Sequence, residues 1–273
     1  MGSPFPTIEL SDPVLEIDGL RHVTVRSPAL GRRADVTIVQ QGEGKPAPLV
    51  VLLHGVYSSH WALAMKGGAH RVLRRLVAAG EIRPMVLAMP SDGLVGDGSG
   101  YLQLIAADAE SWIVDEVPQV ADLALEAGLD GRVCIGGLSM GGYGALRLAG
   151  RFRDRYVAAA GMSSVTSFDQ LRMFTAEVPR LAAPDAADLD LVEILSRGGA
   201  QLPRLSIDCG LSDPLLESNR RLHRALVNAG VNHQYHEYLG GHDWPYWGAH
   251  LADVLRFFES ALVAAESGPV AEL

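Results

Sequence analysis

The stretch RVCIGGLSMGGYGA, residues 132–145, contains the pattern that decides the fold. It opens with an apolar run, residues 133–135, that is typical of a buried strand, and it ends in residues that favour a helix. Between strand and helix, Ser139 stands in a Gly-x-Ser-x-Gly turn. Glycines on both sides of such a serine let the strand and the helix approach each other closely, as a nucleophile elbow requires. We therefore predict that Ser139 is a nucleophile on a tight turn.

A glycine-rich turn between a strand and a helix can also bind a phosphate group. The nucleotide-binding fingerprint, however, needs three glycines at a different spacing and an acid at the end of the next strand. The next apolar strand, residues 156–161, runs into Met162-Ser163-Ser164 and has no acid at its end. The sequence therefore favours the nucleophile over the phosphate site.

Strand and helix patterns alternate along nearly the whole chain. The continuous apolar run LVVLL, residues 49–53, is typical of a strand that is buried on both faces of a sheet. We expect an α/β fold: a mostly parallel sheet of about eight strands, with an antiparallel start and helices on both faces. The predicted strands are residues 20–27, 33–40, 49–53, 85–88, 133–135, 156–161, 204–209 and 232–238, and the main predicted helices are residues 61–79, 107–127, 214–229 and 245–265.

Length, composition and charge bound the class of protein. The 273 residues are 48% hydrophobic and contain no stretch typical of a linker, so we expect a single domain over residues 1–273, with an irregular, Pro-rich start at residues 1–18. The net charge is −9. Nucleic acids and anionic membranes bind basic surfaces, so we expect neither as a partner and expect a small-molecule substrate instead. A homo-oligomer remains compatible with the sequence.

The compartment is read from the first residues and the cysteines. The segment MGSPFPTIEL lacks the basic and apolar regions of a secretory signal, and no apolar run is long enough to span a membrane. Cys134 and Cys209 fall in strands that we place two positions apart in the sheet, ~10 Å from each other, which is too far for a disulfide. We expect a cytoplasmic protein, and a secreted form whose signal has been removed is the alternative.

A serine hydroxyl needs a base within hydrogen-bond reach and an acid that orients the base. In sheets of this kind, sites form in the loops after the strands, and the chain order is serine, acid, histidine. The loop after strand 204–209 contains Asp213, and the loop after the last strand contains His242. We predict a Ser139–Asp213–His242 triad. Asp208 lies inside a strand and Asp243 is adjacent to the histidine, so both are weaker candidates for the acid.

An oxyanion hole requires two backbone N–H groups near the nucleophile. The first is the amide after the serine, here that of Met140, and we predict that the second is the amide of Val56, in the loop after strand 49–53. His54 in that loop is expected to make a structural hydrogen bond. Neither an HExxH nor a CxxC motif occurs, so we predict no metal site and no cofactor.

Five aromatic residues near these loops are candidates for an apolar substrate pocket, and core or rim packing is the alternative for each of them. They are Tyr57, Trp61, Trp244, Tyr246 and Trp247.

Six motifs together resemble the α/β-hydrolases of the family named Putative esterase. In chain order they are SPALG (27–31), LLHG (52–55), MPSDG (89–93), GLSMGGYGA (137–145), CGLSD (209–213) and GHDWPYW (241–247). That family includes tributyrin, feruloyl and acetylxylan esterases, S-formylglutathione hydrolases and mycolyltransferases. The ending of the last motif and the compact size look most like the tributyrin and feruloyl esterases.

The resemblance implies a serine carboxylesterase that hydrolyses short-chain acyl esters through an acyl-enzyme on Ser139. It also implies that residues 167–199 are a variable insert over the active site, where specificity is set. Four alternatives remain open: a carbohydrate esterase of the acetylxylan or feruloyl type, an S-formylglutathione thioesterase, an acyltransferase, and a non-catalytic binding protein on a hydrolase fold.

Overall fold

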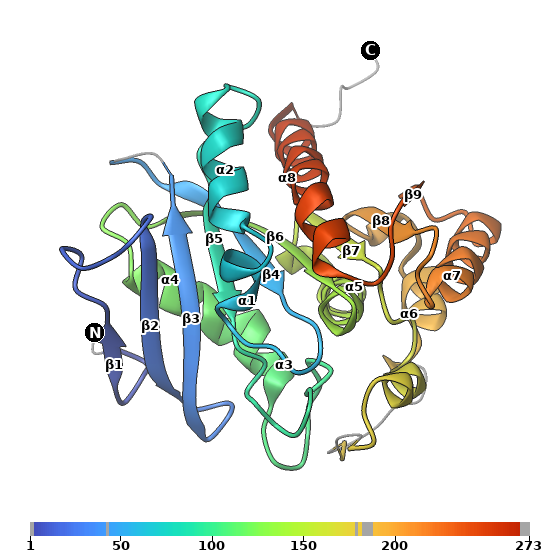
Figure 1. The fold of residues 1–273 in the computed structure, drawn as a ribbon, viewed down its shortest axis with the longest axis horizontal. Coiled ribbons are helices and arrows are strands. Elements are labelled where there is room, and N and C mark those ends of the chain that lie inside the picture. Colours follow the sequence, from blue (N-terminus) through green and yellow to red (C-terminus); the bar gives the residue numbers. More distant parts are fainter. Residues whose placement is uncertain (1–2, 42–43, 178–179, 182–187, 268–273) are drawn as a thin grey trace.

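The computed structural model describes residues 3–41, 44–177, 180–181 and 188–267. Nine strands form one sheet in the order β1-β2-β3-β5-β4-β6-β7-β8-β9 (Figure 1). The strands are β1 (Ile8–Leu10), β2 (Leu20–Ser27), β3 (Arg32–Gln40), β4 (Ala47–Leu53), β5 (Val86–Pro90), β6 (Leu129–Leu138), β7 (Ala158–Met162), β8 (Arg204–Gly210) and β9 (Gln234–Tyr238). The predicted mostly parallel α/β sheet is confirmed.

The sheet changes from antiparallel to parallel within its first half. Strands β1, β2 and β3 pair antiparallel, β3 pairs antiparallel with β5, and all pairs from β5 to β9 are parallel. The additional strand is β1, in the segment that the sequence predicts to be irregular. Its three residues are too few for a recognisable alternation, and they are extended because they pair with Val23–Val25 of β2.

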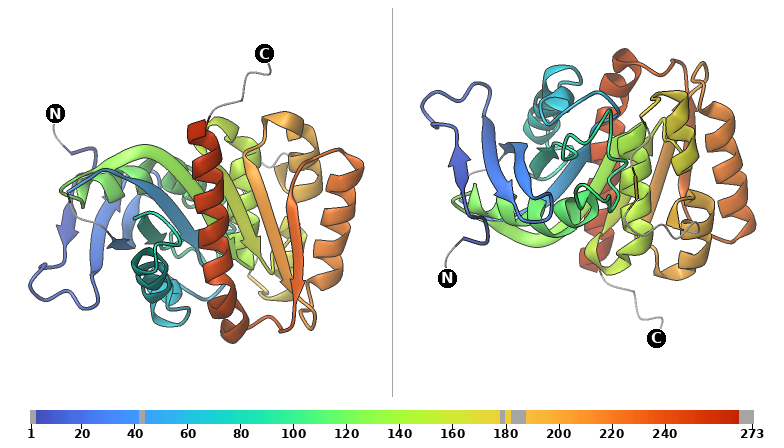
Figure 2. Two further views of the ribbon diagram at one scale, coloured as in Figure 1. Left: turned by 90° about the horizontal axis from the view of Figure 1, so that it is seen from above. Right: turned by 90° about the horizontal axis from the view of Figure 1, so that it is seen from below.

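Helices cover both faces of the sheet (Figure 2). They are α1 (Ala62–Met65), α2 (Ala69–Ala78), α3 (Ala109–Ser111), α4 (Val117–Leu123), α5 (Met140–Arg151), α6 (Leu191–Gly198), α7 (Leu216–Asn228) and α8 (Trp244–Ser267). A π-helical turn, Trp112–Glu116, connects α3 to α4, and a 3-10 helix, Phe168–Met173, lies in the segment after β7.

The predicted helix over residues 107–127 is interrupted by the π-helical turn Trp112–Glu116, and Pro118 lies in the first turn of α4, directly after it. Proline has no backbone N–H, so the carbonyl of Val114, four residues earlier, receives no helical hydrogen bond from it. The guanidinium of Arg155 donates to that carbonyl instead, at 2.8 Å. A side chain from the connection between α5 and β7 therefore replaces the hydrogen bond that Pro118 cannot donate.

Two apolar clusters lie on opposite faces of the sheet. Leu49, Val51 and Leu53 of β4 belong to one cluster, together with side chains of α4, α5 and α7. Val50 and Leu52 belong to the other, together with side chains of α2 and α8. Because successive strand residues point to opposite faces, the continuous apolar run in β4 supplies both clusters.

The topology brings the loops after β4, β5, β6, β7, β8 and β9 to one edge of the sheet, because these strands run parallel. Strand β7 separates β6 from β8, and Cys134 and Cys209 on those strands are buried and free, as predicted. None of the helices in the described ranges has the length and apolar character needed to cross a membrane.

Candidate active site

Ser139 occupies a strained turn between β6 and α5. Its backbone angles are φ 56° and ψ −119°, a conformation that side chains of L-residues rarely adopt. Two glycines make the turn sterically feasible. A Cβ atom at Gly137 would lie 2.4 Å from the backbone of Gly141, and one at Gly141 would lie 2.2 Å from the carbonyl oxygen of Leu53. The strand, the helix and β4 therefore meet at van der Waals distance around the serine.

Three side chains from separate loops form a chain of hydrogen bonds. His242 Nε2 lies 3.0 Å from Ser139 Oγ, and His242 Nδ1 lies 2.9 Å from Asp213 Oδ2. Ser139 follows β6, Asp213 follows β8, and His242 stands between β9 and α8. The three residues that the sequence predicts as a triad are thus in contact.

Asp213 is held as a buried carboxylate. Its side chain is fully buried, and its Oδ1 accepts a hydrogen bond from the amide of Leu215 at 2.8 Å. Burial alone would raise the pKa of Asp213, but the polar groups around the carboxylate, of which His242 lowers the pKa most, outweigh it, and the pKa lies below the ordinary carboxyl value. The ionised carboxylate accepts a hydrogen bond from His242 Nδ1–H and so keeps the proton on Nδ1, which leaves Nε2 free to accept the proton of Ser139.

The two weaker candidates for the acid have other partners. Asp208 is buried in β8 and accepts a hydrogen bond from the hydroxyl of Tyr246 at 2.6 Å. Asp243 Oδ1 accepts from the amide of Tyr246 at 3.0 Å, in the first turn of α8. In the described part of the chain, neither carboxylate has a hydrogen bond to His242.

The two residues predicted for the oxyanion hole lie in chain segments that adjoin Ser139. Met140 is the first residue of α5, and Val56 follows Gly55, at which a Cβ atom would lie 3.3 Å from that of Ser139. A Cβ atom at Gly98 would contact both the Met140 sulfur, at 2.5 Å, and Val56 Cγ1, at 3.2 Å, so these two residues are adjacent.

Neither amide, that of Val56 or that of Met140, donates a hydrogen bond within the described ranges. Met140 is buried and Val56 is half-buried. Two backbone amides without an acceptor, near a serine hydroxyl, could donate to an oxyanion.

His54 is the first residue after β4, in the loop that contains Val56. It is buried, its Nδ1–H donates to the carbonyl of Gly55 at 2.7 Å, and its own carbonyl accepts from the hydroxyl of Tyr101 at 2.9 Å. These contacts are the structural hydrogen bonds expected for this residue.

The five predicted pocket aromatics divide into three groups. Trp247 is buried with its ring perpendicular to that of His242, at 5.0 Å between centroids, and Trp244 contacts Trp247 at 5.3 Å. Tyr57 and Trp61 are 65% and 43% exposed. Tyr246 is only 3% exposed and its hydroxyl binds Asp208, so it lies in the core, which corrects its prediction as a pocket residue.

Sequence reasoning missed Phe174, in the segment after β7. Its ring stacks on the imidazole of His242, with 5.2 Å between centroids and 19° between planes. No motif marks this residue, because its position depends on the path of an irregular segment.

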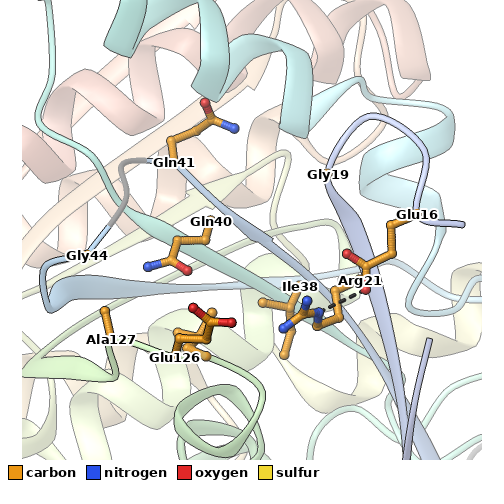
Figure 3. Close-up of a pocket in the computed structure, with 10 residues that line it drawn as sticks. Glu16, Gly19, Arg21, Ile38, Gln40, Gln41, Gly44, Glu126 and Ala127 are labelled. Atoms are coloured by element: carbon orange, nitrogen blue, oxygen red, sulfur yellow. Dashed lines mark hydrogen bonds and ion pairs between the residues drawn. The ribbon is translucent and has the colours of Figure 1, made fainter. Parts of the chain in front are cut away.

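A metal site and a large cavity are two further features that bear on what the chain could bind. Within the described residues, no group of three or more His, Cys, Asp or Glu side chains is arranged to hold a metal ion. A cavity of about 770 Å³ is lined by polar residues that include Glu16, Arg21, Gln40 and Gln41 (Figure 3). Gln40 pairs with the first residue of β5, so this cavity lies at the edge of the sheet opposite to Ser139.

The sheet topology and the strand–serine–helix turn, followed by an acid and a histidine in later post-strand loops, define an α/β-hydrolase. Comparison with known proteins agrees. The chain belongs to the esterase family described as Putative esterase, whose model matches residues 27–258.

Three similar proteins illustrate the relationship. An acetyl esterase of Caldicellulosiruptor saccharolyticus is 31% identical over 140 residues, which are 45% of this chain and 53% of that protein. The structure of a ferulic acid esterase has a TM-score of 0.74 and 25% identity, and the match covers 94% of this chain and 99% of the other. An S-formylglutathione hydrolase of Agrobacterium tumefaciens has a TM-score of 0.76 at 18% identity, with the same coverage. The chain spans about half the length of the curated relatives it matches.

Proposed function

We propose that the protein is a serine carboxylesterase that hydrolyses short-chain acyl esters through an acyl-enzyme on Ser139. The observation that carries the proposal is the continuous chain from Ser139 Oγ to His242 and on to the buried carboxylate of Asp213. Membership of the esterase family supports the class of reaction.

In the first half-reaction, His242 Nε2 takes the proton of Ser139 Oγ while the oxygen attacks the ester carbonyl carbon. Asp213 stabilises the imidazolium that forms. The carbonyl oxygen becomes an oxyanion, which the amides of Val56 and Met140 bind. Loss of one such donor typically costs ~10²–10³ in rate. The tetrahedral intermediate then collapses, the C–O bond to the alcohol breaks, and His242 gives its proton to the departing oxygen.

In the second half-reaction, water takes the place of the alcohol. His242 removes a proton from the water, whose oxygen attacks the acyl carbon, and the Ser139 oxygen leaves with that proton. The acid product and the free serine result. An alcohol acceptor in place of water would make the same site an acyltransferase, because both reactions pass through the same acyl-enzyme.

Ser139→Ala tests the proposal. We expect the variant to fold normally and to lose turnover of p-nitrophenyl butyrate and labelling by a fluorophosphonate probe, since both need the serine oxygen. Retained turnover in a folded variant would contradict the assignment. Wild-type protein that forms no adduct on Ser139 would favour a binding protein on a hydrolase fold.

The substrate class is tested with a panel of acetyl-sugar, feruloyl and thioester substrates, assayed with and without glycerol as acceptor. Faster turnover of a thioester or of a feruloyl ester than of simple short-chain esters would replace the proposed substrate class. Transfer to glycerol in preference to hydrolysis would identify an acyltransferase.

A further inference from the structure

The segment after β7 covers one face of the candidate catalytic histidine. The phenyl ring of Phe174 is nearly parallel to the His242 imidazole, 5.2 Å between centroids. Trp247 approaches the same imidazole at 85° to its plane and 5.0 Å between centroids. The imidazole therefore has aromatic neighbours from two different elements, the segment after β7 and helix α8.

Phe174 is fixed by contacts on both sides of it in the chain. Its amide and that of Thr175 donate to the carbonyl of Leu171, at 2.9 and 3.0 Å, and Leu171 is fully buried. Thr175 is 6% exposed, and its hydroxyl donates to Asp97 Oδ2 at 2.5 Å. The aromatic ring thus belongs to an anchored turn.

The same anchor connects this turn to the loop that contains Val56. The carbonyl oxygen of Asp97 accepts a hydrogen bond from the amide of Tyr57 at 2.8 Å, while its carboxylate holds Thr175. Tyr57 follows Val56 directly, and its φ of 61° shows a constrained backbone at that point. Asp97 therefore connects the turn that contains Phe174 to the loop that contains Val56, one of the two proposed oxyanion donors.

The proton transfer from His242 determines whether the acyl half or the alcohol half of an ester lies next to Phe174. His242 Nε2 must come within about 3 Å of the alcohol oxygen in order to protonate it. The acyl half is attached through the carbonyl carbon, whose oxygen points to the amides on the other side of the serine. The group on the alcohol oxygen is consequently the half of the substrate that lies next to the imidazole and to the ring stacked on it.

We propose that Phe174 is a specificity-determining wall of the leaving-group subsite and that it selects esters of alcohols with a flat aromatic ring next to the ester oxygen. The inference rests on the proposed esterase function. Two aromatic rings in offset or edge contact stabilise each other more than the burial of their contact area alone would. We therefore expect an ester of an aromatic alcohol to be favoured over that of a saturated alcohol by roughly two- to tenfold in kcat/KM.

Benzyl acetate and cyclohexylmethyl acetate are the probes. They share the acetyl group and the CH₂–O linkage, and they differ in the flat ring against the puckered one. We expect Phe174→Leu to lower the ratio of kcat/KM for benzyl acetate to that for cyclohexylmethyl acetate by roughly two- to tenfold. Thr175→Val, which keeps the shape of the side chain and removes its hydrogen bond to Asp97, should lower the same ratio by less.

Two controls separate specificity from positioning and stability. Met173→Leu changes the preceding residue, which is 56% exposed, and should leave the ratio unchanged. In Phe174→Leu, the ratio for methyl butyrate to methyl acetate, which varies only the acyl half, should also stay unchanged. Thermal unfolding identifies any variant that fails to fold.

The outcomes distinguish this inference from the proposed function. An equal loss for both alcohols in Phe174→Leu, an unchanged ratio, or a changed acyl preference overturns the leaving-group wall while the esterase function stands. Wild-type protein that reacts with a fluorophosphonate at Ser139 but hydrolyses neither acetate also overturns it. Wild-type protein that does not react at Ser139 contradicts the proposed function itself.

Discussion

The orientation of His242 depends on one of two nearby carboxylates, and the structure distinguishes them. Asp213 Oδ2 contacts the Nδ1 atom, whereas Asp243 Oδ1 accepts the amide of Tyr246 at the start of α8. We expect Asp213→Asn to lower kcat for p-nitrophenyl acetate by roughly 10⁴, because an amide no longer enforces the required tautomer. Asp243→Asn should stay within about tenfold of wild type, because it alters only one bond in a helix turn.

The measurement is steady-state kcat at neutral pH, with circular dichroism to show that both variants fold. A greater loss in Asp243→Asn than in Asp213→Asn would mean that the wrong acid has been assigned.

Single residues differ in how far the sequence predicts them. Ser139, Asp213 and His242 are predictable because each must fall in a loop after a parallel strand, and strand order can be read from apolar patterns. The position of Tyr246 could not be predicted, because a tyrosine one helical turn from a site can point inward as well as outward. Here it points into the core, where its hydroxyl donates a hydrogen bond to Asp208. The stacking of Phe174 on His242 depends on an irregular segment without periodicity.

At the scale of elements, the elbow depends on glycines that let β6, α5 and β4 meet. A Cβ atom at Gly141 would lie 2.2 Å from the carbonyl oxygen of Leu53 and 2.7 Å from that of His54, and both oxygens belong to rigid backbone. We expect Gly141→Ala to lower the free energy of unfolding by at least about 3 kcal/mol and to abolish turnover, since β4 and the Val56 loop must move.

Gly248→Ala in α8 is the matched control. Its nearest neighbour outside the helix is the carbonyl oxygen of Gly67, 3.5 Å from the added Cβ atom, which is an ordinary contact. Alanine in a helix should raise the free energy of unfolding by up to ~1 kcal/mol. Urea unfolding of the three proteins checks both values, and a Gly141→Ala variant as stable as wild type would show that the elbow can relax.

Apolar sequence patterns predict some of the strands and helices and not others. Strand β4 is predictable because its long apolar run is buried on both faces of a parallel sheet. Strand β1 and the π-helical turn Trp112–Glu116 could not be predicted in this way. Strand β1 exists only through its pairing with β2, and the contact of Arg155 with the carbonyl of Val114 joins residues far apart in the sequence.

At the scale of the whole molecule, helix α8 covers the middle of one sheet face and begins two residues after His242 (Figure 1). A buried carboxylate lies between this helix and β8. Asp208 is 6% exposed and binds the Tyr246 hydroxyl, and the charged groups that act on it, Asp253 and Asp213, are acids too. Burial, more than these neighbours, raises the pKa of Asp208 to about 7.

A carboxyl group whose pKa is higher in the folded protein binds its proton more tightly there than in the unfolded chain. Between about pH 4 and pH 7 the folded state holds this proton and the unfolded state does not, so the stabilisation is complete at low pH and is lost as the pH rises through about 7. The contribution of Asp208 to the free energy of unfolding should fall by up to ~1.4 kcal/mol for each pH unit in this range.

Asp208→Asn isolates this effect, because an amide oxygen can still accept the Tyr246 hydroxyl and the side chain no longer titrates. We expect the free energy of unfolding of the variant, relative to that of wild type, to increase steadily from pH 4 to pH 7 and to be constant above about pH 8. Any fixed cost of the buried amide shifts the whole curve and does not change its slope. Urea unfolding at five or six pH values measures the difference directly, and parallel curves for the two proteins would show that Asp208 is ionised throughout and that a cation or water compensates its burial.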